Sequence, residues 1–296
     1  IPDVTIRNLQ PFVTFIPVCP EVEIGLGTPR ETIRIVEENG ENRLVQPSTR
    51  EDVTEKMEQF SNDFLQTIPD VDGFILKNRS PSCGTRDVKI YSGFEKAPAK
   101  GKGAGLFGGA VVKNFSHLPI EEEGRLSNFI IREHFFTRLF TIAYYKMIKH
   151  NKNMKELVSF QSDNKYLFMA YNQVKQKELG RIIANQKNEK IEVVFENYEK
   201  TLYELFMRAP RYTSNVNVCE HIFGYFKTKL KKQEKDHFIE LLQKYAEKKI
   251  PLSSLLTILK SWAIRFDEKY LLRQTYFEPY PEALVEISDS GKGRDY

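Results

Sequence analysis

Residues 12–21, with the sequence FVTFIPVCPE, join a run of apolar and β-branched residues directly to Cys19 and Glu21. Such a run is typical of a buried β-strand. A second strand-like run, residues 73–76 (GFIL), leads within a few residues to Cys83. Because the carboxyl ends of parallel strands meet at the ligand-binding edge of a sheet, we expect the two cysteines to lie close together. The residues alone leave open whether they are buried small apolar side chains, metal ligands or nucleophiles.

The rest of the first half alternates between strand and helix signals. Asn39-Gly40 lies between two strand-like runs and predicts a hairpin, because both residue types tolerate a positive φ. Ser48 and Glu51 have the spacing of a capping box, which predicts the start of a helix. The predicted elements, in order, are strands at 32–36 and 43–45, a helix at 48–66, a strand at 88–91 and a helix at 105–115. This alternation predicts an α/β domain, Rossmann-like and three-layered, with a mostly parallel sheet.

The second half carries only helix signals, so we expect a C-terminal all-α domain. The predicted helices span residues 128–150, 153–161, 163–186, 190–208, 214–231, 233–247, 252–266 and 268–275. The domain junction is predicted within residues 118–128, and the polar, glycine-containing residues 286–296 are predicted to form a flexible tail.

Composition and charge exclude several classes of protein. The 296 residues are 41% hydrophobic and 12% aromatic, which excludes a disordered chain. No stretch of about 18 uncharged apolar residues occurs, so no membrane span is expected. Three cysteines exclude a disulfide scaffold and fit the reducing cytoplasm.

The charge is divided unevenly along the chain. Residues 1–125 hold 15 Lys and Arg against 19 Asp and Glu, a net charge of −4. The remaining 29 and 21 give residues 126–296 a net charge of +8. The second half is therefore the better candidate for holding a polyanion.

Residues 103–108, GAGLFG, match the dinucleotide-binding pattern G-x-G-x-x-G. The match does not lie at the first strand-to-helix turn, and no convincing βαβ unit with an acidic residue about 20 positions further on surrounds it. We therefore expect these glycines to let a helix N-terminus pack closely on the sheet, where it could at most approach a substrate phosphate.

Three segments of the first half resemble the thiouracil desulfidase family: residues 15–21 (FIPVCPE), 25–30 (GLGTPR) and 80–84 (SPSCG). The resemblance covers about residues 1–118. The second half resembles the helical YbgA-type domain, with matching stretches at 165–170, 179–181, 217–226, 250–252 and 274–281. The combination resembles the tRNA 4-thiouridine desulfidases. It implies a catalytic α/β domain at 1–120 and a tRNA-binding helical domain at 126–285.

The family holds a [4Fe-4S] cluster with three cysteines and leaves one iron open, and the open iron is thought to take the sulfur of a thiocarbonyl. The resemblance implies that Cys19 and Cys83 are two cluster ligands and that the third lies upstream of Ile1, with a further strand and loop. It implies that Glu21 is the acid/base carboxylate and that Ser80 is a catalytic hydroxyl. The residues expected to bind the substrate are Thr28, Arg30, Lys77 and Ser82.

Loop 25–30 could donate backbone N–H groups and a guanidinium to a nucleotide, or it could be only a tight turn. Cys219 lies on a predicted helix and is expected in the core. The missing third cysteine leaves a second explanation open, namely a degenerate relative that holds no cluster.

The second half also carries candidate RNA contacts, because phosphates attract cations and unpaired bases stack on aromatic side chains. They are Lys165, Lys175, Lys177, Arg181, Lys227, Lys229, Lys231 and Lys232. A solvated lysine-rich surface would look the same. Asn217, His221 and Tyr225 share one helix face; we expect them to form a buried polar network, with RNA reading as the alternative.

We therefore expect an Fe–S-dependent desulfidase that acts on 4-thiouridine in tRNA, with no DNA or membrane partner. A desulfidase of free thiouracil or another small thio-compound is the first alternative. A non-catalytic RNA-binding protein with a degenerate α/β domain is the second.

Overall fold

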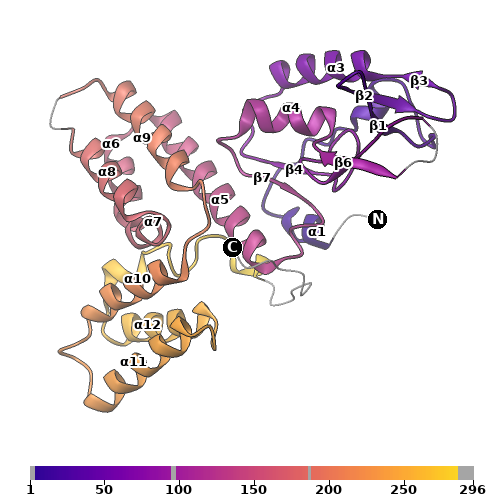
Figure 1. Cartoon of the computed structure of the whole chain (residues 1–296). Coiled ribbons are helices and arrows are strands. Elements are labelled where there is room, and N and C mark those ends of the chain that lie inside the picture. Colours follow the sequence, from indigo (N-terminus) through magenta and orange to yellow (C-terminus); the bar gives the residue numbers. More distant parts are fainter. Residues whose placement is uncertain (1–3, 95–97, 186–187, 286–296) are drawn as a thin grey trace. The chain divides into compact units, whose positions relative to one another are not determined.

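The structure is a computed structural model that describes residues 4–94, 98–185 and 188–285 (Figure 1). The chain divides into two compact units. An α/β unit holds the described residues up to Phe135 together with those from Ala283 onward, and a helical unit spans Phe136–Glu282. The predicted tail at 286–296 lies outside the described residues.

The α/β unit contains a five-stranded sheet in the order β3-β2-β1-β5-β6 and a two-stranded sheet of β4 and β7. The strands are β1 (Arg34–Glu38), β2 (Glu41–Gln46), β3 (Glu51–Asp52), β4 (Phe74–Leu76), β5 (Val88–Tyr91), β6 (Ala99–Gly103) and β7 (Ile120–Glu122). Only the pairs β1–β5 and β4–β7 are parallel, and the other three pairs are antiparallel. The α/β class is confirmed, whereas the prediction of a mostly parallel sheet is wrong.

Local turn chemistry explains the antiparallel pairing. Asn39 and Gly40 join β1 to β2 with φ angles of 53° and 85°. Glu38 pairs with Glu41 across this turn, which confirms the predicted hairpin. Such a short connection can only make neighbouring strands antiparallel.

Residues 12–18 are not a strand, so the prediction made from FVTFIPV is wrong. Among the described residues, no strand hydrogen-bonds to this segment. Its apolar residues Phe12, Phe15 and Ile16 are exposed. An apolar run specifies a strand only when a neighbouring strand pairs with it, and sequence periodicity does not report that neighbour.

The helix predicted from Ser48 begins later. The short strand β3 intervenes, and α3 spans Thr54–Thr67. The carboxylate of Asp52, and not Ser48, accepts a hydrogen bond from the first helical amide, that of Thr54, at 2.9 Å. Phe60 and Phe64 on α3 pack against Phe107 on α4, which spans Leu106–Phe115. Figure 1 shows α3 and α4 together on one side of the strands.

Strand β7 lies in the stretch from which the sequence predicts a domain junction. Its register aligns Leu76 of β4 with Glu122. The strand therefore places three consecutive acidic residues, Glu121, Glu122 and Glu123, beside the start of the loop that follows β4.

The second half of the chain is helical, as predicted. The helices are α5 (Phe129–Asn151), α6 (Met154–Asp163), α7 (Lys165–Tyr171), α8 (Gln173–Ala184), α9 (Ile191–Leu205), α10 (Tyr212–Gly224), α11 (Lys232–Ala246), α12 (Leu252–Arg265) and α13 (Lys269–Leu272). The single helix predicted at 163–186 is divided at Asn172, whose side chain caps α8. No helix among the described residues is long and apolar enough to cross a bilayer.

An aromatic core holds the helical unit together. Tyr145 and Tyr198 stack with their ring centroids 5.4 Å apart, and both are fully buried. Their hydroxyls donate to the carbonyl of Phe195 and to the side chain of Gln161, each at 2.6 Å, so the buried polar atoms are paired. Cys219 is fully buried in this core, as predicted.

The polar network expected on α10 is centred on a different residue. Asn215 is buried and bonds to the hydroxyls of Tyr245 and Tyr276 at 3.2 and 2.9 Å. His221 and Tyr225 are exposed. The prediction of a buried network through them is therefore wrong, because their helix face points toward solvent.

Candidate functional site

The short helix α2 (Pro20–Glu23) begins directly after Cys19. Proline fits the first position of a helix, because its missing N–H would have no partner there. This start turns Glu21 inward: its exposed fraction is 9%, whereas the neighbouring Val22 and Glu23 are exposed. Cys19 itself is half-buried.

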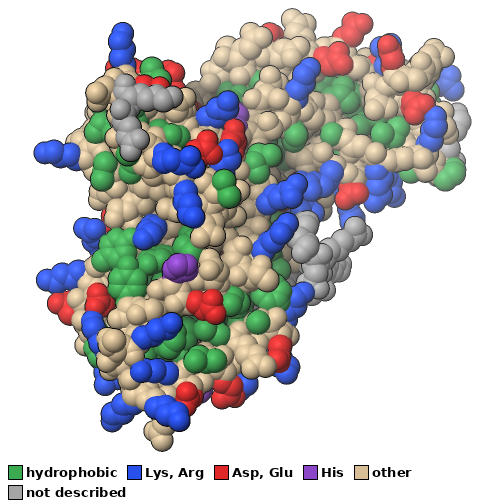
Figure 2. All heavy atoms as spheres, turned by 60° about the vertical axis from the view of Figure 1, so that its left-hand side comes forward, with side chains coloured by type: hydrophobic (Ala, Val, Ile, Leu, Met, Phe, Trp, Pro, Cys, Tyr) green, Lys and Arg blue, Asp and Glu red, His purple; other side chains and the backbone are tan. Residues whose placement is uncertain are grey.

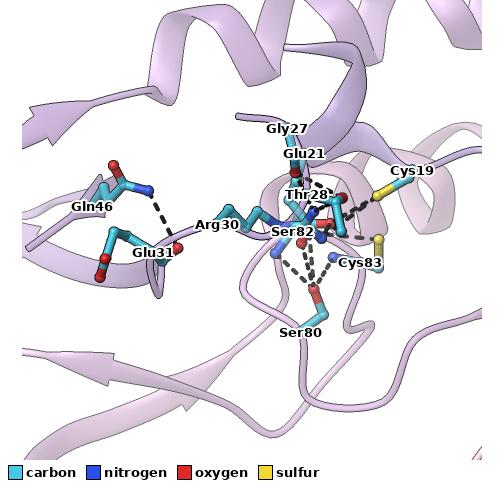
Figure 3. A network of polar contacts seen from close by, with 10 residues as sticks. All are labelled: Cys19, Glu21, Gly27, Thr28, Arg30, Glu31, Gln46, Ser80, Ser82 and Cys83. Atoms are coloured by element: carbon cyan, nitrogen blue, oxygen red, sulfur yellow. Dashed lines mark hydrogen bonds and ion pairs between the residues drawn. The ribbon is translucent and has the colours of Figure 1, made fainter. Parts of the chain in front are cut away.

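Glu21 is the centre of a polar network drawn in Figure 3. Its Oε2 contacts a guanidinium nitrogen of Arg30 at 2.9 Å and the Sγ of Cys19 at 3.3 Å. Its Oε1 accepts hydrogen bonds from the hydroxyls of Ser80, at 3.3 Å, and of Ser82. Arg30 supplies the opposite charge that a buried carboxylate needs.

Ser80 also shapes the second loop. Its hydroxyl oxygen accepts from the backbone amides of Ser82 and Cys83 at 3.3 and 3.1 Å, and its carbonyl accepts from the amide of Gly84 at 2.9 Å. Because both backbone amides donate to the Oγ atom of Ser80, its own proton is left to donate to Glu21 or to Ser82.

The two cysteines of the unit are in contact with this network. Arg30 lies 3.7 Å from the Sγ of Cys19, and the hydroxyl of Ser82 lies 3.6 Å from the Sγ of Cys83. The pKa of the Cys83 thiol is raised to about 11, mainly by burial; the hydrogen bond from Ser82 opposes this rise and the negative charge of Glu21 adds to it. Cys83 is therefore a protonated thiol at neutral pH unless a cation replaces the proton.

The glycine pattern at 103–108 lets the N-terminus of α4 pack closely, as predicted, but its partner is the Cys83 loop and not the sheet. The amides of Gly105, Leu106 and Gly108, at the start of α4, donate to the carbonyls of Gly84, Pro81 and Ser82. A Cβ on Gly105 would lie 2.5 Å from the carbonyl oxygen of Ser82, and one on Gly108 would overlap that of Cys83. These helical amides are occupied by the protein's own carbonyls.

The donor set fits an iron–sulfur cluster only in part. Cys19 and Cys83 supply two half-buried thiols around one carboxylate. The third thiol of this sequence, Cys219, is fully buried among aromatic side chains of the helical unit. Among the described residues no group of three or more His, Cys, Asp or Glu side chains is arranged to hold a metal ion. Two thiolates are one fewer than the expected cluster requires.

The residues expected to bind the substrate have different surroundings. Ser82 is fully buried and bonds to Glu21. Thr28 and Arg30 lie on the exposed loop, where Arg30 donates to the hydroxyl of Thr28 at 3.2 Å and to the carbonyl of Gly27 at 2.8 Å. The structure does not bring Lys77 into this network: its amino group forms an ion pair with Glu123 at 2.6 Å.

The expected RNA contacts all lie in the helical unit. Lys175 is held in ion pairs with Glu204 and Glu178, and Lys229 is paired with Glu268. The amino groups of two others lie over aromatic rings, Lys165 over Tyr166 and Lys227 over Phe223. The remaining four are exposed, and no ion pair joins them to the part of the chain that the structure describes: Lys177, Arg181, Lys231 and Lys232.

Figure 2 shows cationic side chains spread over one face of the chain with acidic ones between them. Lys231 and Lys232 stand at the N-terminal end of α11, where the helix dipole disfavours cations.

Two acidic residues next to the site were missed by the sequence analysis. Glu122 and Glu123 accept hydrogen bonds from backbone amides of the Cys83 loop, whereas the sequence predicts a domain junction in their stretch. The available signal was the apolar Leu118-Pro119-Ile120 run before three acidic residues, which is compatible with a short buried strand.

Comparison with known proteins identifies the class of each part. Residues 2–123 match the family model described as 2-thiouracil desulfurase, and residues 165–281 match one described as a protein of unknown function, DUF1722. The chain therefore combines a 2-thiouracil desulfurase domain with a DUF1722 domain. The match of residues 2–123 to a desulfurase family supports an enzymatic function.

The helical part also has a curated relative. The chain is 22% identical over 156 residues to the uncharacterized protein YbgA of Escherichia coli (strain K12), a match that covers 52% of this chain and 92% of the relative. No solved structure matches the chain.

Proposed function

We propose that this protein removes the sulfur of a thiouracil-type base by hydrolysis, and that its substrate is 4-thiouridine in tRNA. The observation that carries the proposal is the convergence of two thiols, two serine hydroxyls and a guanidinium on the buried carboxylate of Glu21 in a desulfurase-family domain. The reaction converts a C=S group and water into a C=O group and hydrogen sulfide.

Glu21 is the group that moves protons. It takes a proton from the water that attacks the thiocarbonyl carbon and returns a proton to the departing sulfur. Arg30 holds the carboxylate in place, because its guanidinium contacts the Oε2 atom at 2.9 Å. The hydroxyls of Ser80 and Ser82 bind the Oε1 atom, so both oxygens are oriented before the substrate arrives.

Cys19 and Cys83 would hold a [4Fe-4S] cluster together with one further thiolate that the described residues do not provide. When bound, such a cluster supplies a soft Lewis acid for sulfur through an iron with an open coordination position.

The charge of the two halves supports a polynucleotide substrate. The site lies in the half with a net charge of −4, which would repel a polyanion, whereas the half with a net charge of +8 would attract it. Lys231 and Lys232 are exposed at the N-terminal end of α11, where the helix dipole also attracts anions. We therefore assign them as phosphate contacts.

A comparison of substrates tests the proposal. The full-length chain, prepared without oxygen and supplied with iron and sulfide, is incubated with tRNA that contains 4-thiouridine, with the free nucleoside and with 2-thiouracil. Sulfide release measures turnover of each compound, and we expect the highest kcat/KM for the tRNA. The matched controls are Cys83→Ser, which loses a proposed ligand, and Cys219→Ser, which changes a core thiol only.

The outcomes separate the alternatives. Equal kcat/KM for tRNA and 2-thiouracil favours a desulfidase of small thio-compounds. Tight tRNA binding without sulfide release favours an RNA-binding protein without catalysis. An unchanged rate in Cys83→Ser contradicts the assignment of that thiol.

A further inference from the structure

The loop that follows β4 carries three of the site residues: Ser80, Ser82 and Cys83. It has no regular secondary structure, so its own backbone hydrogen bonds hold it only near Ser80. A loop of this kind needs partners from other elements to keep a fixed shape. The start of α4 provides such partners for the loop's carbonyl groups.

The loop's amide groups are bound by carboxylates at the end of β7. The Oε1 atom of Glu122 accepts from the backbone amides of Thr85 and Arg86 at 2.7 and 3.3 Å, and from the hydroxyl of Thr85 at 2.9 Å. Glu122 is 1% exposed, so these donors replace the water that a carboxylate would otherwise bind. One oxygen therefore fixes the end of the loop, directly after Cys83.

Glu123 binds the other end of the same loop. Its Oε2 accepts from the backbone amide of Asn78 at 2.6 Å, and its Oε1 pairs with Lys77 at 2.6 Å. The amide of Glu123 donates to the carbonyl of Leu76 at 3.0 Å, which fixes the carboxylate relative to the end of β4. Hydrogen bonds to charged acceptors are the stronger ones in proteins.

We propose that Glu122 and Glu123 are positioning residues that fix the two ends of the loop of residues 77–86 and thereby hold Ser80, Ser82 and Cys83 against Glu21. Within the described residues, no hydrogen bond or ion pair joins either carboxylate directly to the Glu21 network, so both act through the loop backbone. The inference rests on the proposed function for its effect on turnover, but the loop geometry itself does not depend on any substrate.

The neighbouring residue Glu121 supplies a matched control. It is nearly as buried as Glu122, and its Oε1 accepts from Arg125 at 2.7 Å and from the amide of Glu122 at 3.0 Å. In the part of the chain that the structure describes, Glu121 makes no hydrogen bond to the Cys83 loop. Glu121→Ala therefore removes a buried carboxylate from β7 and leaves the loop bonds in place.

The first readout is the alkylation rate of each cysteine by iodoacetamide, measured by peptide mass spectrometry on the full chain. Glu122→Ala should raise the rate at Cys83 by about tenfold or more, because the loop loses three hydrogen bonds to a charged acceptor. Glu122→Gln keeps an oxygen acceptor and should give a smaller increase. Cys219 should stay protected in every variant.

The second readout is turnover of the preferred thio-substrate. Glu122→Gln should lower kcat and change KM little, because a displaced loop misplaces the reacting groups more than it weakens binding. Glu121→Ala should match the wild type in both readouts. If Glu122→Ala does not fold, Glu122→Gln alone decides the result.

Two results would overturn the inference: wild-type Cys83 alkylation in Glu122→Gln, or an equal rise in Glu121→Ala. Failure of the proposed function looks different. In that case the wild type releases no sulfide from any thio-substrate, while the alkylation rates still distinguish Glu122 from Glu121.

Discussion

The α/β unit and the helical unit differ in the charge of their buried polar side chains. Among the described residues, the buried side chains of the charged types Asp, Glu, Lys and Arg all lie in the α/β unit: Glu21, Glu121, Glu122 and Arg132. The buried polar side chains of the helical unit are neutral; Asn215 bonds to Tyr276, Gln161 to Tyr198 and Gln274 to the carbonyl of Ser162. Burying a charge is costly even when it is paired, so buried charges often mark functional sites, and this difference favours the α/β unit as the place of the proposed chemistry.

The largest effect should come from Glu21. Glu21→Gln keeps the shape of the side chain but removes its ability to move a proton, so we expect kcat to fall by about 10²–10⁴-fold. Binding of tRNA should be unchanged, because the substitution leaves the helical unit intact. Rapid-quench turnover and a filter-binding measurement would show both, and a normal kcat would contradict the assignment of Glu21.

The close packing of α4 on the Cys83 loop gives the next prediction. Gly108→Ala places a Cβ against the carbonyl of Cys83 and should lower the free energy of unfolding by about 1–3 kcal/mol. Gly109→Ala is the matched control, since its Cβ would meet only the Cβ of Ala104 at 3.4 Å. It should be neutral or stabilising by up to about 1 kcal/mol. Equal effects in urea titrations would contradict the packing account.

The surface of the helical unit is tested by charge reversal. Lys231→Glu with Lys232→Glu should weaken tRNA binding and reduce the salt dependence of log Kd by about two units, one per lost phosphate contact. Turnover of 2-thiouracil should not change. Lys175→Gln is the control, because Glu204 and Glu178 already hold that amino group. If the double variant has the same salt dependence of log Kd as the wild type, Lys231 and Lys232 are not phosphate contacts.

The smallest effect concerns Glu133 on α5. Burial raises the pKa of this carboxyl to about 7, with the Arg132 charge opposing the shift. A raised carboxyl pKa stabilises the folded state at low pH, and this contribution is lost as pH rises through 7. Between pH 8 and pH 6 the wild type should therefore gain about 1 kcal/mol of unfolding free energy relative to Glu133→Gln. Urea unfolding at both pH values measures the difference, and a constant difference would contradict it.

Elements with local signals could be predicted from the sequence. The Asn39-Gly40 hairpin and the long helix α5 follow from turn chemistry and periodicity that lie within a few residues of one another. The structure of residues 12–18 could not be predicted and the sequence signal for strand β7 is weak, because strand formation depends on partners distant in the sequence.

The candidate site was predictable where a family motif carries it. Cys19, Glu21 and Cys83 were chosen from the resemblance, and the structure brings them together. The carboxylate of Glu122 was missed because it binds backbone amides 36 and 37 residues away, and no local pattern reports such a contact.

Hydrolysis in ¹⁸O-labelled water tests the central claim, that the α/β unit replaces thiocarbonyl sulfur with oxygen from water. The full-length, iron- and sulfide-supplied chain is incubated with tRNA that contains 4-thiouridine, and the nucleosides are analysed by mass spectrometry. The account predicts uridine that carries one ¹⁸O atom and one sulfide released per uridine, with neither product from Glu21→Gln at a comparable rate. Uridine without the label, or 4-thiouridine that persists while tRNA is bound, would contradict it.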